Sequence, residues 1–330
     1  MPPTDRCAHG QDPRVLTVGR INLDFYASDL GVHMREAKTF VASVGGSPTN
    51  IAMVAQRLGV RAAVLTATGD DLAGELVRQQ LTDAGVDVRW VHTIPGAPTS
   101  MAILAQPCPD EGQRQFFRLG PADSLMTSAH AAGLPWDELD IVLLSGDAMA
   151  SGTTPAIIPD LSATAGRHGI EVWWDLDLRP SSWASLDSYG SAVHPALSKA
   201  DVVIGTEEEF AALLCLGEPT RSELVKAVSD LDLPHVVLKL GPDGIMLITE
   251  GVEETIVPSR STNPVCTVGG GDATAGSLVA ARLSGWSWQD SLELAMRVAG
   301  YTVEQPYCSD GFPTMSQLGA HEASPTVSVT

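Results

Sequence analysis

The chain has 330 residues, 44% of them hydrophobic, and carries 40 acidic against 20 basic side chains, for a formal net charge of −20. This length allows one large α/β domain or two modest ones with a substantial buried core. The negative charge opposes nucleic acid and anionic membrane surfaces, so neither is expected as a partner. Binding of a phosphate would therefore depend on local backbone donors, an arginine and a divalent cation.

The sequence shows no signal for export or membrane insertion. Residues 1–13 are polar and contain three prolines, and no segment has the apolar length of a membrane span. The five cysteines are scattered without a C-x-x-C pair, which indicates reduced thiols and a cytoplasmic location. The eight histidines lack ligand spacing, so a zinc site built by the protein is not expected.

Short β-branched runs alternate with amphipathic stretches along most of the chain. This alternation predicts a mostly parallel sheet covered by helices on both faces. Helices are expected over residues 47–58, 71–84 and 288–303. In the first of them, Ser47 can cap the helix, Pro48 suits the first helical position and Gly59 ends the run. The expected strands are residues 15–19, 63–69, 141–146, 170–175, 202–205, 236–241 and 245–249.

Two stretches, residues 25–44 and 99–119, interrupt this alternation. They contain alternating or aromatic residues and turn signals but no convincing helix. They predict a small antiparallel sheet outside the main one, which would lie as a lid over the carboxyl ends of the strands, where α/β folds bind ligands. We therefore expect residues 1–330 to form a single domain with a lid made by these two stretches.

Gly45 and Gly46 precede the first expected helix, whose apolar face must point to the core. Asn50 in its first turn is then free to face a ligand, and its amide can donate and accept at once, as polyols require. The simpler interpretation is a hairpin exit with Asn50 on the surface. On this motif alone, the simpler interpretation is favoured.

Polar residues also follow two of the expected strands. Asp24, after the first, could accept hydrogen bonds from two neighbouring hydroxyl groups, although a turn or cap aspartate is the alternative. After residues 170–175, Asp175, Asp177 and Arg179 project to one side. Arg179 can bind a carboxylate or phosphate through two nitrogens. A structural ion pair with Asp175 or Asp177 is the competing interpretation.

The most informative motif is Gly269-Gly270-Gly271-Asp272, at the start of a helix-like run. Three glycines let the backbone N–H groups turn toward one point, and the helix that begins there adds the positive end of its dipole, so this turn can hold a phosphate. A carboxylate beside a phosphate is repulsive unless it accepts a proton from the attacking hydroxyl group. A flexible loop ending in a capping aspartate is the alternative.

Thr206 and three glutamates, residues 207–209, open another helix-like run. Such acidic residues usually only complement the helix dipole. However, both the Walker G-x-x-x-x-G-K-[ST] loop and the dinucleotide G-x-G-x-x-G are absent, so a nucleotide would need Mg²⁺, and carboxylates that order its water shell belong at this edge. Lys239 precedes a tight turn between two strands. The functional alternative places adenine across its glycines, Gly241 and Gly244.

Together, Gly45-Gly46-x-x-x-Asn50-x-Ala52 and Gly269-x-Gly271-Asp272 resemble the two signatures of the ribokinase-like (PfkB) sugar kinases, in the same order and over nearly the whole chain. Three further segments are most similar to the 5-dehydro-2-deoxygluconokinases of this family and share part of their pattern with the 2-keto-3-deoxygluconate kinases. These segments are residues 172–183, 204–210 and 308–314.

The resemblance implies a Rossmann-like, three-layer α/β domain with a β-sheet lid, which often serves for dimerisation and would allow a homodimer here. It also implies phosphorylation of a hydroxyl group on a sugar or keto-sugar acid by ATP with Mg²⁺. Asp272 would be the general base, and Glu209 would organise Mg²⁺ through water. The backbone amides of Gly269, Gly270, Gly271 and Asp272 would form the anion hole. The positions that match the family's sugar-binding residues are Asp24, Gly45, Gly46 and Asn50. Arg118 and Arg179 are candidates for binding a substrate carboxylate or the phosphate. The positions expected to bind ATP are Thr206, Lys239, Gly241, Gly244, Gly269 and Gly271.

The chain departs from the family pattern just before the catalytic aspartate. Where the family usually has D-T-T-G-A-G-D, this chain has Cys266-Thr267-Val268 before the three glycines and Asp272. The Asp and Thr lost at Cys266 and Val268 belong to the monovalent-cation loop of potassium-dependent relatives, which puts potassium activation in doubt. Thr206 replaces the Asn of the family's N-x-x-E element.

The acceptor stays open between a 5-dehydro-2-deoxygluconate-like acid and 2-keto-3-deoxygluconate, fructose or a nucleoside, all acceptors within the family. A non-catalytic sugar- or nucleotide-binding regulator is the alternative of another class. Only the irregular loop at residues 266–268 favours it, and the intact Asp272 opposes it. A nicotinamide-dependent oxidoreductase is disfavoured by the missing dinucleotide fingerprint.

Overall fold

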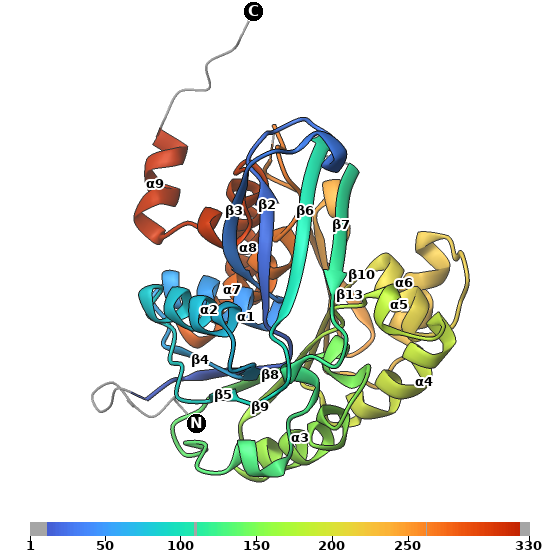
Figure 1. Cartoon of the computed structure of the whole chain (residues 1–330). Helices are drawn as coiled ribbons and strands as arrows, with labels where there is room; N and C mark the ends of the chain where they lie inside the picture. Colours follow the sequence, from blue (N-terminus) through green and yellow to red (C-terminus); the bar gives the residue numbers. More distant parts are fainter. Residues whose placement is uncertain (1–11, 109–110, 262, 324–330) are drawn as a thin grey trace, which may run out of the picture.

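The computed structural model describes residues 12–108, 111–261 and 263–323. In this part of the chain, a central sheet lies between two layers of helices, and a second, smaller sheet rises above it (Figure 1). The predicted three-layer α/β fold with a mostly parallel sheet and a separate lid is confirmed. No helix among the described residues is long and apolar enough to cross a membrane.

The central sheet comprises β1 (Val15–Val18), β4 (Ala62–Thr68), β5 (Val91–Thr93), β8 (Ile141–Ser145), β9 (Glu171–Asp175), β10 (Val202–Thr206), β11 (His235–Lys239), β12 (Ile245–Thr249) and β13 (Val252–Val257). Its order is β13-β12-β11-β10-β9-β8-β1-β4-β5. The strands from β5 to β11 pair in parallel, while β12 and β13 add an antiparallel edge. The chain moves outward from β1 to β4 and β5, then returns to β8 on the other side of β1. Open α/β sheets bind ligands at such a switch point.

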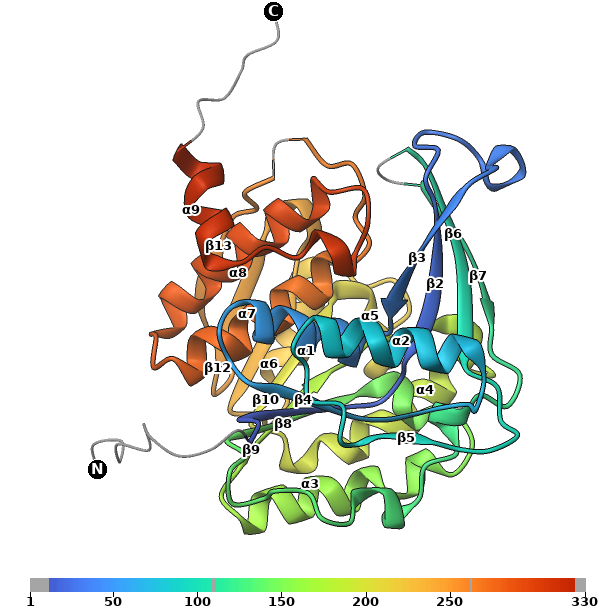
Figure 2. The same ribbon diagram turned by 60° about the vertical axis from the view of Figure 1, so that its left-hand side comes forward.

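Successive side chains of each strand face opposite helix layers. On β1, Val15 packs toward one layer, while Leu16 and Val18 pack toward the other. Figures 1 and 2 show the two helix layers. The first contains α1 (Ser47–Arg57), α2 (Leu72–Asp83), α7 (Gly270–Leu283) and α8 (Trp288–Val303). The second contains α3 (Ile158–Arg167), α4 (Leu186–Ala196), α5 (Glu207–Leu213) and α6 (Arg221–Ser229). α9 (Met315–Ala323) ends the described chain.

The lid comprises β2 (Asn22–Ala27), β3 (Phe40–Gly45), β6 (Ser100–Cys108) and β7 (Glu111–Phe117), in the order β3-β2-β6-β7. It lies within and just before the two predicted stretches. Both hairpins, β2-β3 and β6-β7, are antiparallel, and they join through β2 and β6, which run parallel. β2 follows β1, and β6 follows β5. Because β1 and β5 point the same way, both lid strands leave the same edge of the central sheet (Figure 2).

The helices predicted over residues 47–58, 71–84 and 288–303 are α1, α2 and α8. The start of α1 differs from the prediction, because Gly46, with φ of 104°, is the N-cap residue and Ser47 is the first helical residue. A Cβ atom on Gly46 would lie 2.4 Å from the carbonyl oxygen of Arg20, so a side chain does not fit there. The hydroxyl group of Ser47 therefore has another partner than the helix end.

α1 and α7 pack closely, and this contact brings their N-termini together. A Cβ atom on Gly276 would lie 2.6 Å from Cβ of Val54 and 2.8 Å from the carbonyl oxygen of Ile51. Only a glycine in α7 therefore allows the observed approach of α1. The spacing of these two helices positions the two glycine-rich motifs of the sequence beside each other.

We expect Gly276→Ala to reduce the free energy of unfolding by about 1–3 kcal/mol, because the added methyl group overpacks the α1–α7 contact. Chemical denaturation measures the change. The matched control is Gly166→Ala on α3, where an added Cβ meets nothing within 4 Å; it should be neutral or stabilise by up to about 1 kcal/mol. Equal effects of the two substitutions would contradict the role of close helix packing.

Candidate active site

A cavity of about 190 Å³ lies between the carboxyl ends of the central strands and the lid. Its lining combines charges of both signs, and the glycine-rich turns at the starts of α1 and α7 face it. Such a lining suits a ligand that carries both hydroxyl and anionic groups. The acidic residues of the lining are Asp24, Asp175, Asp177, Glu209 and Asp272, and the basic ones are Arg20, Arg114, Arg179 and Lys239.

Asp272 lies in the first turn of α7 and is held by the first turn of α1. Ser47 Oγ donates to its Oδ1 atom at 2.7 Å, and Asn50 Nδ2 donates to its Oδ2 atom at 2.7 Å. Burial raises the pKa of Asp272, the charge of Asp177 adds to this rise, and the two hydrogen bonds oppose it. A half-buried carboxylate with a raised pKa, at a helix N-terminus, is suited to accept a proton.

The glycine turn before Asp272 is closely packed. Gly269, with φ of 89°, is the N-cap residue of α7, and a Cβ atom there would lie 2.2 Å from Sγ of Cys308. The N–H groups of a first helical turn have no acceptor within the helix. One of the predicted anion-hole donors, the N–H of Gly270, donates to the carbonyl oxygen of Thr267 at 3.3 Å. Gly269 and Gly271 line the cavity.

Asp24 projects from β2 into the same cavity. Its side chain is buried, its Oδ1 atom has no hydrogen-bond partner among the described residues, and burial raises its pKa to about 6. A Cβ atom on Gly45 would lie 2.0 Å from Oδ2 of Asp24, so glycine makes room for this carboxylate. An unpaired buried acceptor of this kind indicates a ligand that supplies hydrogen-bond donors.

Arg179 forms an ion pair and also reaches the cavity. Its Nη2 atom lies 2.7 Å from Oδ1 of Asp177, whose other oxygen accepts from Ser145 at 2.8 Å. The structural ion pair weighed for Arg179 is therefore present. The Nε atoms of Arg179 and of Arg20 are both buried without a hydrogen-bond partner among the described residues. Each arginine thus keeps a donor for a ligand.

Lys239 lies among carboxylates on the opposite side of the cavity. Its Nζ atom is 3.5 Å from Asp175 and 3.7 Å from Oε2 of Glu209. Burial raises the pKa of Asp175 to about 7 against the opposing charge of Lys239. Lys239 also borders the glycine turn, since a Cβ atom on Gly271 would lie 3.4 Å from its Nζ atom. This places one cation between the acidic cluster and the turn.

Glu209 is fixed by backbone donors. Its carboxylate accepts from the N–H of Thr206 at 2.7 Å and from the N–H of Leu178 at 3.1 Å, and Thr206 caps α5 in return. Among the described residues, no three acidic, histidine or cysteine side chains gather as a metal site. Mg²⁺ usually keeps several waters and binds one or two carboxylates together with phosphates. Glu209 therefore fits a contact with Mg²⁺ through water better than a direct one.

Five of the predicted site residues lie outside the cavity lining: Gly45, Gly270, Arg118, Gly241 and Gly244. Arg118, at the lid root, is paired with Asp123 at 2.9 Å. Gly241 and Gly244 lie in the turn between β11 and β12. Whether they contact a ligand stays a prediction.

Arg114 on β7 lines the cavity, whereas Arg118 does not. Arg114 was not among the predicted site residues, although it has the same parity along the chain as Arg118. Ser47 was also missed, because a serine at a helix start has an ordinary role as a cap. Arg20 carries no sequence signal beyond its place after β1.

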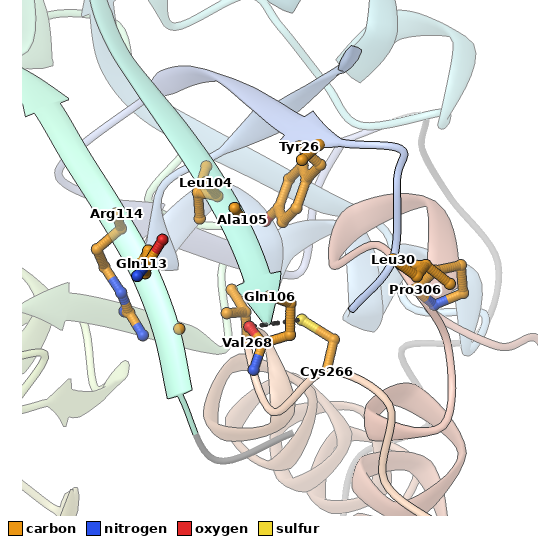
Figure 3. Close-up of a pocket in the computed structure, with 12 residues that line it drawn as sticks. Tyr26, Leu30, Leu104, Ala105, Gln106, Gln113, Arg114, Cys266, Val268 and Pro306 are labelled. Carbon is orange, nitrogen blue, oxygen red and sulfur yellow. Dashed lines mark hydrogen bonds between the residues drawn. The ribbon is translucent and has the colours of Figure 1, made fainter. Parts of the chain in front are cut away.

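The loop before the glycine turn contacts the lid. Cys266 is buried and its thiol donates to Oε1 of Gln106 on β6 at 3.7 Å (Figure 3). Tyr26, Arg114 and Val268 surround a small hollow there that adjoins the main cavity. The thiol of Cys266, whose pKa is raised by burial, thus holds this loop against the lid.

A parallel α/β sheet with a lid, a glycine turn at a helix N-terminus and a half-buried carboxylate beside it is the arrangement of a sugar kinase. Residues 12–315 match the model of the pfkB family of carbohydrate kinases. The chain belongs to this family, and the predicted enzyme class is confirmed.

Similar curated proteins are the 5-dehydro-2-deoxygluconokinases of Geobacillus thermodenitrificans and Bacillus thuringiensis, which are 29% and 27% identical to this chain. The alignments cover 92% and 93% of this chain and 91% and 93% of the two relatives.

Solved structures share the fold. An E. coli protein described as ribokinase II, in complex with ATP and Mg²⁺, has a TM-score of 0.82 at 18% identity, covering 93% of this chain and 98% of that one. A double-mutant fructokinase from Vibrio cholerae with fructose, ADP and potassium bound has a TM-score of 0.82 at 24% identity, covering 94% and 99%.

We expect the buried Asp24 to lower stability as the pH rises. Its pKa is about 6 in the fold against an ordinary value of 3.8, so the folded state holds a proton that the unfolded chain releases between about pH 4 and 6. Asp24→Asn should therefore gain stability relative to the wild type across that window, as measured by urea unfolding from pH 3 to 8.

The matched control is Asp29→Asn, also in the lid region. Backbone N–H donors of Lys38 and Thr39 lower the pKa of Asp29, so this variant should lose stability relative to the wild type as the pH rises. If the difference in unfolding free energy between wild type and Asp24→Asn stayed constant with pH, this would contradict the burial of an ionisable Asp24.

Proposed function

We propose that this sugar kinase transfers the γ-phosphoryl group of ATP to a hydroxyl group of a sugar acid, with a 5-dehydro-2-deoxygluconate-like acid as first choice and 2-keto-3-deoxygluconate as the alternative. The observation that carries the proposal is the half-buried Asp272 carboxylate, which accepts two hydrogen bonds from α1 and faces a cavity where Arg20 and Arg179 keep unpaired donors. The curated relatives named 5-dehydro-2-deoxygluconokinase support the choice of acceptor.

Asp272 acts as the general base. The acceptor binds between the lid and the sheet, where Asp24 and Asn50 contact its hydroxyl groups, and Asp272 takes the proton of the attacking hydroxyl. The N–H groups at the start of α7, aided by the helix dipole, stabilise the charge on the transferring phosphoryl group. The lid excludes water that would otherwise compete as acceptor.

The nucleotide lies on the side of β10 and β11, next to Thr206, Lys239, Gly241, Gly244 and the glycine turn. Mg²⁺ bound to ATP neutralises phosphate charge and is ordered through water by Glu209. The ammonium group of Lys239, next to Gly271, adds a second positive charge beside the phosphates. Because Cys266 is uncharged where potassium-dependent relatives have an aspartate, we infer that potassium is not required.

Arginines on two sides of the cavity bind the carboxylate of the acid. Among the described residues, no carboxylate lies within ion-pairing distance of Arg114, and burial together with the charge of Arg179 lowers its pKa. Two facing guanidinium groups are stabilised by an anion between them. We therefore place the carboxylate contact at Arg114 and Arg179, with Arg114 in the place first predicted for Arg118.

The outer face of the lid supports a homodimer. Met101 on β6 and Phe117 on β7 are cross-strand partners and both exposed, and Phe40 on β3 is exposed as well; exposed apolar side chains on a sheet are found at interaction surfaces. A cytoplasmic location and the lack of nucleic-acid or membrane partners stay predictions.

Asp272→Asn should reduce kcat by about two to four decades, the range expected for removal of a general base. Release of ADP in the presence of the sugar acid measures the rate. Asp160→Asn, an exposed aspartate in the first turn of α3, is the matched control and should keep the parental rate. If Asp272→Asn kept most of the activity, Asp272 would not be the base.

Arg114→Met should raise KM for the sugar acid roughly ten- to a hundredfold, the effect of losing one charged hydrogen bond, and leave KM for ATP unchanged. The KM for a neutral acceptor such as fructose should rise far less. Arg167→Met, on the exposed side of α3, is the control. An equal rise in KM for the acid and for the neutral sugar would contradict the carboxylate contact.

A further inference from the structure

The first turn of α1 holds the carboxylate of Asp272 at both oxygens. Ser47 Oγ and Asn50 Nδ2 each donate at 2.7 Å, one to Oδ1 and the other to Oδ2. The two donors are 2% and 5% exposed, so water does not replace them readily. An ionised carboxylate accepts about four hydrogen bonds, and each oxygen of Asp272 therefore keeps a lone pair for an acceptor hydroxyl group.

The backbone makes the hydroxyl group of Ser47 available for this contact. Because Gly46 is the N-cap residue, Ser47 is already helical and caps nothing. The close approach at Gly276 then sets α1 against α7, so that Ser47 meets a residue 225 positions later in the chain. The contact is thus imposed by helix packing and does not depend on a bound ligand.

Asn50 differs from Ser47 because it keeps a hydrogen-bond acceptor available for a substrate. Its Nδ2 atom donates to Asp272 and also to Sγ of Cys308 at 3.4 Å, while its Oδ1 atom is buried without a partner among the described residues. Asn50 can therefore bind an acceptor hydroxyl group and Asp272 at once. The hydroxyl of Ser47, by contrast, is directed at the base.

We propose that Ser47 is a positioning residue for the phosphoryl transfer, whose hydroxyl group fixes the orientation of the Asp272 carboxylate and favours its ionised form. The inference rests on the proposed role of Asp272 as the base. A hydrogen bond donated to a carboxylate stabilises the charged form, so Ser47 opposes the burial that would keep Asp272 protonated. Without Ser47 the base is protonated up to a higher pH and is free to rotate away from the acceptor.

Other charged and titratable groups also face Asp272, and they are the same in wild type and variants. They are Asp24 from β2, Asp175 and Asp177 from the end of β9, Arg179 after it, Lys239 from β11 and the thiol of Cys308. A change in the pH profile between wild type and a Ser47 variant therefore reports on the removed hydroxyl group.

The test is the pH dependence of kcat for Ser47→Ala, with MgATP and the sugar acid saturating. Loss of one hydrogen bond should move the acid limb to higher pH by about half a unit to one unit, with a severalfold lower kcat below it and KM for the sugar acid within about twofold of the wild type. Ser47→Thr, which keeps a hydroxyl group, should restore the acid limb. If the alanine variant does not fold, Ser47→Cys removes the strong donor at similar volume and should show the same shift.

Ser277→Ala is the matched control, since this buried serine on α7 bonds only to the backbone of its own helix. It should leave the acid limb in place. An acid limb unchanged in Ser47→Ala, or shifted equally in Ser277→Ala, would overturn the proposal, and so would a rise in KM for the acid without a shift, which would make Ser47 a substrate contact.

The variant Asp272→Asn distinguishes an error about Ser47 from an error about the proposed function. If Asp272→Asn is slow while Ser47→Ala keeps its acid limb, only the positioning role of Ser47 is wrong. If Asp272→Asn keeps most of the rate, the assignment of Asp272 as the base is wrong.

Discussion

The site depends on keeping one carboxylate ionised inside a buried cavity. Burial and the charge of Asp177 both favour the protonated form of Asp272, while Ser47, Asn50 and Arg179 favour the charged one. The same balance recurs around it, because Asp175 is offset by Lys239 and Asp177 by Arg179. Pairing of this kind offsets part of the cost of burying charged groups. The alternating charges of the cavity are therefore a condition for the proposed placing of a general base beside a phosphate.

The second constraint is that the lid must carry its polar residues to a fixed position over the sheet. Arg118 donates to Asp123, Asn22 and Ser100, and Asp123 also accepts from the N–H of Ile21. These bonds join the starts of β2 and β6 and the end of β7. Asp24 and Arg114 project into the cavity from strands that are fixed at this root. Arg118 thus helps to fix the position of the lid, and its contact with a substrate stays a prediction.

Much of the fold could be predicted because its signals are local. β-branched runs marked most central strands, and glycines marked helix ends such as Gly59. The parallel pairing of β2 with β6 could not be predicted, since it depends on the shared direction of β1 and β5. β5 and β13, the two edge strands, were missed; β5 has only three residues, too few to show a pattern.

The residues of the candidate site divide in the same way. The glycines and Asp272 form a contiguous motif with a clear physical meaning, and the structure brings them together with Asp24 and Asn50. Alternation alone could not decide between Arg114, on β7, and Arg118, just after it, because the two have the same parity along the chain. The structure separates them, since Arg118 pairs with Asp123 and Arg114 lines the cavity. The partner of Ser47 lies on another helix, and no local pattern reveals it.

The central claim is that this chain phosphorylates a sugar acid, and product analysis tests it most directly. The chain is incubated with MgATP and 5-dehydro-2-deoxygluconate, 2-keto-3-deoxygluconate, fructose, ribose or a nucleoside, and the products are identified by mass spectrometry and phosphorus NMR. The account predicts a phosphomonoester of one of the two acids, formed in step with ADP and faster than any neutral product. A preference for a neutral nucleoside, or ADP release without a phosphorylated acceptor, would contradict it.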